Sequence, residues 1–112
     1  MKIIISNILK SNTAAYQDEG HKVYDTIVDL LNSKISFELS FEGLETCSTL
    51  FLNASVGKLY RNFSEELINS YMKITGIEED DTIMPKMINR SIAKALNVEF
   101  YETIRNQAFE LA

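Results

Sequence analysis

The stretch from Lys34 to Phe63 constrains the fold most, because it joins two different hydrophobic periodicities through a glycine-containing turn. Its first part alternates apolar and polar residues, a pattern of period two that is typical of a β-strand, with apolar positions at Ile35, Phe37, Leu39 and Phe41. Gly43 interrupts this pattern, and the segment 42–47 is expected to turn the chain. Apolar residues then recur every three or four positions and predict a helix with a buried stripe at Leu52, Val56, Leu59 and Phe63.

The residues of this stretch also resemble a known family. Leu-Ser-Phe-Glu-Gly-Leu at 39–44, Ser-Thr-Leu-Phe-Leu-Asn-Ala at 48–54 and Gly-Lys-Leu at 57–59 are similar to STAS-like domains, the family type of the anti-sigma-factor antagonists. In such domains a strand ending in an LDF-type sequence leads into a serine-rich turn and a helix. The chain departs from that pattern at Ser40, where the family usually has Asp. It departs again at Leu50, which aligns with the serine that is phosphorylated in regulated antagonists.

The rest of the chain supplies elements on both sides of this unit. We expect a strand over Ile3–Leu9, a helix over Thr13–Asn32, a strand over Tyr71–Thr75 and a helix whose first turn contains Pro85. The helix 13–32 has its apolar face at Tyr16, Val23, Ile27, Leu30 and Leu31, and a close packing contact would explain the glycine at position 20. The apolar pattern continues to the end of the chain through Phe100, Tyr101, Ile104, Ala108 and Leu111.

The order of these elements is β-α-β-α-β-α, which predicts an α/β fold. Such alternation usually gives a parallel sheet with right-handed crossovers and helices on its faces. The resemblance to STAS-like domains implies a mixed sheet with helices mainly on one side. We therefore expect a single STAS-like domain over residues 1–112, with a small three- to four-stranded sheet, mixed or parallel, and helices packed against it.

Charge and cysteine content narrow the class of function. The chain has a net charge of −5, and its 11 basic residues form no cluster, so nucleic-acid binding is not expected. A single cysteine allows no disulfide within the chain, and no apolar run is long enough to span a membrane. We expect a cytoplasmic protein that does not bind membranes.

The hydroxyl groups of Ser48 and Thr49 are the sharpest candidates for a functional site. Either residue can cap the following helix, and a phosphate at this helix start would gain from the helix dipole and from free N–H groups. The alternatives are a plain helix cap, a docking surface that is never phosphorylated, and a phosphorylation switch. Asn53 and Lys58 on the following helix complete the candidate docking surface.

Two other reactive side chains have simpler interpretations. His21 is followed at i+4 by Asp25 and not by His or Cys, so we expect an exposed histidine without a catalytic or metal-binding role. Cys47 precedes the helix start, where a thiol pKa can fall, but a partly buried residue in the turn is the expected reading. The acidic run Glu78–Asp81 lacks the spacing of a calcium loop and is expected to be a solvated helix start.

No phosphate-binding glycine loop, catalytic triad or metal cluster is evident, so no catalytic residue, cofactor or metal ligand is assigned. The expected function is a non-catalytic protein-interaction or regulatory domain. The resemblance implies that its partner is a histidine-kinase-like ATPase, docked through the turn 46–49 and the following helix. The alternatives are a small-ligand or nucleotide-binding α/β domain, and a structural homodimer that buries the stripe from Phe100 to Leu111 in a second copy.

Overall fold

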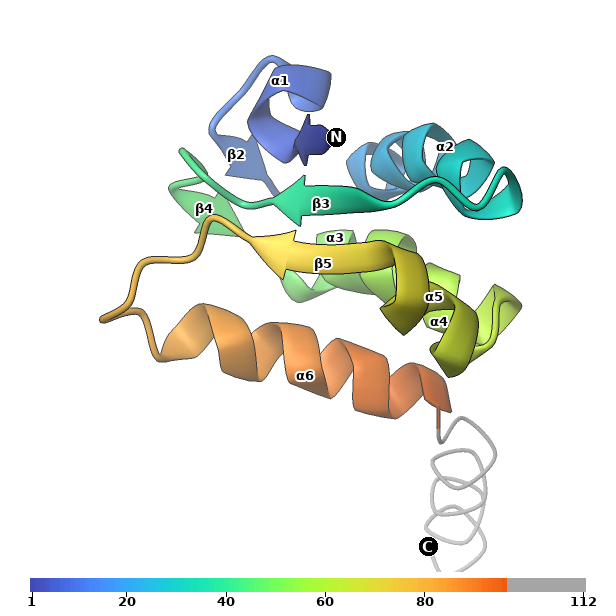
Figure 1. Cartoon of the computed structure of the whole chain (residues 1–112). Helices are drawn as coiled ribbons and strands as arrows, with labels where there is room; N and C mark the ends of the chain where they lie inside the picture. The colour runs from blue at the N-terminus through green and yellow to red at the C-terminus, as the bar shows by residue number, and fades with distance from the viewer. Residues whose placement is uncertain (97–112) are drawn as a thin grey trace, which may run out of the picture.

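The computed structural model describes residues 1–96 and shows an α/β arrangement (Figure 1). A three-stranded sheet contains β1 (Lys2–Ile4), β3 (Phe37–Ser40) and β5 (Met72–Thr75). Both neighbouring pairs are parallel and the spatial order is β1-β3-β5, so the central strand is the one at the middle of the strand–turn–helix stretch. Parallel neighbours need long crossover connections, and helices supply them here. The predicted small sheet with packed helices is confirmed, and all of its strand pairs are parallel.

The helices lie between and after these strands. They are α1 (Ile5–Leu9), α2 (Gln17–Asn32), α3 (Thr49–Leu52), the π-helix η1 (Asn53–Gly57), α4 (Lys58–Asn62), α5 (Glu65–Tyr71) and α6 (Ile83–Leu96). The segments α3, η1 and α4 follow one another without a break, so the helix predicted after the turn is present but contains a π-helical turn. Pro85 lies in the first turn of α6, as the sequence predicts, where its missing N–H leaves no helical bond unmade.

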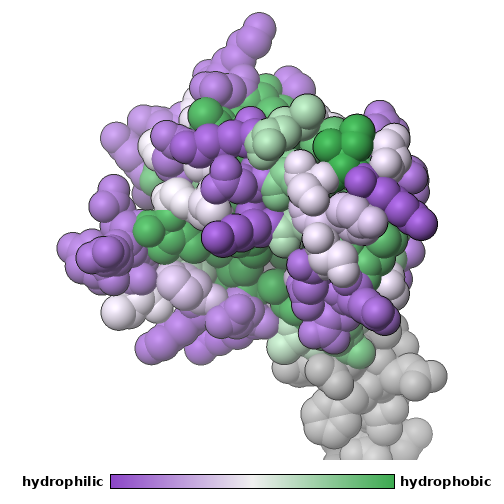
Figure 2. Space-filling view, viewed as in Figure 1, coloured by the Kyte–Doolittle hydropathy of each residue, from purple (hydrophilic) through white to green (hydrophobic). Residues whose placement is uncertain are grey.

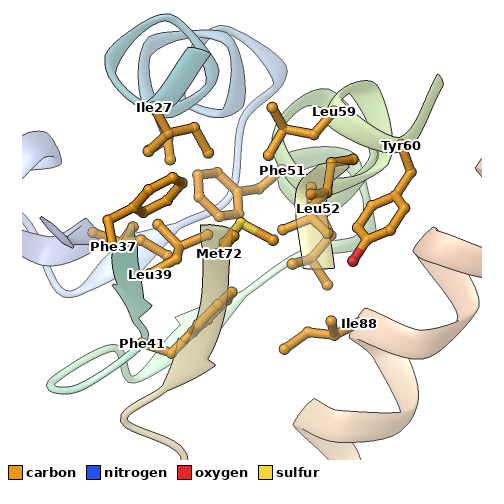
Figure 3. Close-up of a cluster of buried hydrophobic side chains, with 14 of the residues drawn as sticks. Ile27, Phe37, Leu39, Phe41, Phe51, Leu52, Leu59, Tyr60, Met72 and Ile88 are labelled. Carbon is orange, nitrogen blue, oxygen red and sulfur yellow. The ribbon is translucent and has the colours of Figure 1, made fainter. Parts of the chain in front are cut away.

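The two faces of the sheet differ as the period-two pattern requires. Phe37 and Leu39 are buried, and Figure 3 shows them beside Met72 and facing Ile27 of α2 and Phe51 of α3. The opposite face carries a charged row in which Glu38 of β3 is in register with a lysine on either side, Lys2 and Lys73. Figure 2, seen from the same side as Figure 1, shows many hydrophilic side chains, with hydrophobic ones visible between them.

The buried helix residues follow the predicted stripe closely. Phe51, Leu52, Val56 and Leu59 are all fully buried, whereas Phe63 lies just beyond α4 and is half-buried. Together with α2 and the sheet they form one hydrophobic core, which Ile88 of α6 joins from a third helix. The helical period therefore predicted the core face correctly up to the end of α4.

Two boundaries near the N-terminus differ from the prediction. The expected strand Ile3–Leu9 ends at Ile4, and residues 5–9 are helical, with Ile5 buried. The expected helix over Thr13–Asn32 begins only at Gln17, because Thr13 and Ala14 pair as β2 with β4 (Thr46–Cys47), in a second, two-stranded parallel sheet. These pairings place Tyr16 at the start of α2, where it is 67% exposed and not part of the buried face.

Smaller differences occur in the central stretch. Ile35 was expected to lie on the buried face of the strand, but β3 begins at Phe37 and Ile35 is 43% exposed. The segment 42–47 does turn the chain, with Gly43 at a positive φ of 78°, and it also contributes β4. The third strand begins at Met72 and not at Tyr71, which still belongs to α5.

The glycine inside α2 has the packing role that its position suggested. A Cβ atom at Gly20 would lie 2.6 Å from Cβ of Ala54 and 2.6 Å from the main-chain oxygen of Phe51. The absence of a side chain at position 20 therefore lets α2 approach η1 closely. On the other side of η1, a Cβ at Gly57 would lie 3.0 Å from Oγ of Ser91 in α6. Small residues thus hold η1 between two helices.

Two sequence-based expectations lie outside the described part. The stripe from Phe100 to Leu111 falls beyond residue 96, so the homodimer interface stays a prediction. Within residues 1–96, no helix combines the length and apolar character needed to cross a membrane.

Candidate functional site

The turn at 46–49 is held in place by hydrogen bonds to the segment before α2. The N–H of Ser48 donates to the oxygen of Ala14 over 2.9 Å, and its hydroxyl donates to the oxygen of Ala15 over 2.5 Å. The same hydroxyl accepts a bond from the N–H of Phe51 over 3.1 Å. The sequence left open whether Ser48 or Thr49 is the cap, and the structure assigns this role to Ser48.

The first two residues after the cap are presented to solvent. Thr49 is exposed at the first position of α3, and Leu50 is 61% exposed at the second. Tyr16, 67% exposed, follows the carbonyl that the Ser48 hydroxyl contacts. An exposed hydroxyl residue and two large exposed side chains therefore surround a turn whose backbone is fixed by hydrogen bonds.

Cys47 occupies the less reactive of its two expected environments. The thiol is half-buried at the end of β4, and this burial raises its pKa from an ordinary value of 9.0 to about 12. The predicted partly buried residue in the turn is confirmed, and proximity to the helix start does not lower the thiol pKa.

Asn53 and Lys58 lie on the helix that follows the turn, as expected, but neighbouring helices contact their polar groups. The Asn53 side-chain oxygen accepts a 2.6 Å bond from Ser91 of α6, and its main-chain oxygen accepts one from Arg61. The Lys58 ammonium lies 4.3 Å from the centroid of the Tyr24 ring and 3.4 Å from Nδ1 of a half-buried histidine in α2. Of the four candidates, Thr49 therefore has the most accessible side chain.

That half-buried histidine is His21, which the sequence led us to expect on an exposed surface. Its side chain contacts Lys58 of the continuous helical segment α3–η1–α4, which we call the central helix. The contact joins Nζ of Lys58 in the central helix to a ring nitrogen of His21 in α2. His21 therefore belongs to the interface between α2 and the central helix.

A pocket of about 260 Å³ lies where α2, the central helix and α6 meet. It is lined by Gln17, His21, Leu50, Asn53, Ala54, Gly57, Arg61, Ser91, Lys94 and Ala95. The small residues Ala54, Gly57 and Ser91 form part of its wall, so the glycine and serine contacts that let the helices approach also shape the space. π-Helical turns are frequent at functional sites, and three lining residues come from η1.

The charge of this pocket is opposite to that of the chain. Among residues 1–96, the lining includes two cations, Arg61 and Lys94, together with His21, and no aspartate or glutamate. The chain as a whole carries a net charge of −5. The sequence did not assign Gln17, Arg61, Ser91 or Lys94 to a binding site, because they lie on three helices, α2, α4 and α6, that only the fold brings together.

The acidic run before α6 has a structural role. Oδ1 of Asp81 accepts bonds from the N–H groups of Ile83 and Met84, both over 3.0 Å, and so caps the helix. The expected helix start is confirmed for this residue. In the part of the chain that the structure describes, no three His, Cys, Asp or Glu side chains are grouped so that they could hold a metal ion.

Comparison with known families agrees with the central stretch. The sequence model of the STAS-like domain of unknown function (DUF4325) matches residues 19–82, more than half of the chain. The chain belongs to this STAS-like family. The matched region of the STAS-like domain runs from the first turn of α2 through β5, and it includes the turn 46–49 and the lining residues His21 to Arg61. No curated protein and no solved structure matches the chain.

Proposed function

We propose that this STAS-like domain is a non-catalytic protein-interaction module that docks a partner through the turn 46–49 and the start of α3. The observation that carries the proposal is the exposure of Thr49, Leu50 and Tyr16 around a rigid turn. Exposed apolar side chains on an ordered backbone lose little conformational freedom on binding, so they are effective contact residues. The family resemblance favours a histidine-kinase-like ATPase as the partner.

Any regulation by phosphate at this surface would act at Thr49. The Ser48 hydroxyl is engaged as both donor and acceptor, whereas the side chain of Thr49 is exposed at the first turn of the helix. A phosphate on Thr49 would gain from the helix N-terminus and would also place two negative charges where the partner docks. Intact-mass analysis of protein from the native cell, with peptide mapping, tests for this modification.

The docking surface is tested by quantitative capture with tagged full-length chains. Leu50→Asp places a charge in the surface and is expected to reduce recovery of the partner about tenfold or more, the usual effect of a central apolar contact. Ile83→Asp is a matched control, because Ile83 is also exposed, at 69%, and lies at the start of α6. Equal recovery by wild type and Leu50→Asp, with both chains folded, would reject the surface.

The pocket supports a second candidate function, the binding of a small anionic ligand such as a nucleotide. Its cationic lining is the specific observation that favours this alternative. A ligand that binds only the folded chain raises the melting temperature by mass action, so a thermal-shift series with nucleotides tests it. A saturable shift that Lys94→Gln removes would favour ligand binding over protein docking.

A further inference from the structure

We propose that the pocket between α2, η1 and α6 receives a carboxylate side chain, Glu or Asp, from an acidic segment of the docked protein partner. This inference rests on the proposed function, and it adds the chemistry by which the partner would be recognised. The pocket is continuous with the docking surface, because Leu50 contributes to both and Gln17 directly follows Tyr16.

The charge of the lining selects an anion. Arg61 and Lys94 are exposed and lie on different helices, α4 and α6, so the pocket offers an anion a cation from each of two helices. None of the lining residues within the described part of the chain, 1–96, carries a carboxylate that would compete for them. The Arg61 guanidinium uses one N–H for the oxygen of Asn53 and has four further N–H donors, enough to bind a planar carboxylate.

The size of the pocket favours a side chain over a free cofactor. Its volume is about 260 Å³, below the roughly 300–1,000 Å³ that is common for small-molecule sites. Ala54 and Gly57 line it with little side-chain bulk, and Gln17 and Asn53 add amide groups to the lining. A short acidic side chain matches this limited volume and the two cations of the lining.

The test is an NMR titration of the isotope-labelled full-length chain with short synthetic peptides. The probe alternates glutamate and glycine, and its control alternates glutamine and glycine. We expect the glutamate peptide, and not the glutamine peptide, to shift amide resonances of residues 53–61 and 91–95. Shifts confined to other regions, or equal shifts with both peptides, would overturn the proposal.

Variants separate a local site from the overall charge. Lys94→Gln is expected to weaken binding of the glutamate peptide roughly twofold to fivefold, as removal of an exposed ion pair does. Lys86→Gln removes the same charge from an exposed position on the same helix outside the pocket, and binding should stay unchanged. Equal weakening by both variants would indicate a general charge effect and reject the site.

Two further titrations test whether the bound carboxylate comes from a protein or from a free anion. Glutarate and inorganic phosphate are titrated in the same way, and binding of either as tight as that of the peptide would reject a partner side chain in favour of a free anion.

Capture experiments separate this inference from the proposed function. Loss of partner capture by Leu50→Asp, with capture and peptide binding unchanged in Lys94→Gln, would keep the docking turn and reject the pocket.

Discussion

The hydroxyl of Ser48 donates over 2.5 Å to the main-chain oxygen of Ala15, 33 positions earlier in the chain, and so joins the starts of α2 and α3. It also accepts from the N–H of Phe51, so one side chain caps α3 and ties it to the segment that precedes α2. Thr49, its neighbour, is exposed. We therefore expect the same substitution to change the stability of the chain differently at Ser48 and at Thr49.

Substitution of Ser48 should reduce stability more than substitution of Thr49. Ser48→Ala removes both bonds and is expected to lower the free energy of unfolding by about 1–3 kcal/mol. Ser48→Asp keeps a cap acceptor but sets a carboxylate against the Ala15 oxygen, so it should also destabilise the fold. Thr49→Asp should stay within about 0.5 kcal/mol of wild type, as is usual for surface substitutions. Urea denaturation of the three variants measures these differences, and an unaffected Ser48→Ala would contradict the assigned role of the hydroxyl.

The contact between Gly20 and Ala54 predicts an unequal response of the two glycines beside η1. Gly20→Ala would place a methyl group 2.6 Å from a main-chain oxygen and from another methyl group, and we expect a loss of about 1–3 kcal/mol. The nearest atom to a Cβ at position 57 is the Ser91 hydroxyl oxygen at 3.0 Å, with two main-chain oxygens at 3.5 and 3.6 Å, and the better helix propensity of alanine in Gly57→Ala, worth about 1 kcal/mol, should offset most of the cost. Thermal denaturation of both variants, compared with wild type, checks the order of stability. A Gly20→Ala chain as stable as Gly57→Ala would show that α2 and η1 can separate freely.

The raised pKa of Cys47 predicts slow alkylation. Because the folded chain holds the thiol pKa near 12 and an ordinary value is 9.0, the native protein contains about a thousandfold less thiolate at neutral pH than the unfolded one. The rate of reaction with iodoacetamide in native buffer should keep rising with pH beyond 9, whereas the rate in denaturant should level off near that value. The sign follows from burial, which disfavours the thiolate. A native rate that levels off at or below pH 9 would show that the thiol is solvated or activated.

Asp81 is expected to be the acidic residue of its run that matters for stability. Asp81→Ala removes the acceptor for the N–H groups of Ile83 and Met84 and should cost about 1 kcal/mol. Asp80→Ala is the adjacent control, since Asp80 is exposed. Denaturation midpoints of the two variants measure the difference, and equal midpoints would reject the cap.

The periodic parts of the chain were predictable because a repeating pattern exposes one face of an element. The alternation around Phe37 and Leu39 indicated β3, and the spacing of Leu52, Val56 and Leu59 indicated the buried side of the central helix. The π-helical turn within that helix was not predictable, because the same spacing is compatible with a regular α-helix. Thr13 and Ala14 were missed as a strand because two residues carry no period of their own.

The candidate site was predictable only in part, for a similar reason. The helix start at Ser48 has a local signal, a hydroxyl residue directly before an apolar helical pattern, and this was sufficient to locate the turn. Which of the two adjacent hydroxyls caps the helix depends on the carbonyl of Ala15, which reaches the turn from another part of the chain. The exposed position of Tyr16 follows from the same β2–β4 pairing.

Sequence alone determined the α/β class, the strand–turn–helix unit and the location of most core residues, because hydrophobic periodicity and capping are local properties. Tertiary structure decided which polar groups are free, because the contacts of Asn53, Lys58 and His21 all come from other helices. It also decided that Arg61 and Lys94, 33 positions apart in the chain, line one pocket. Long-range packing creates this charge arrangement, and no local pattern of residues encodes it.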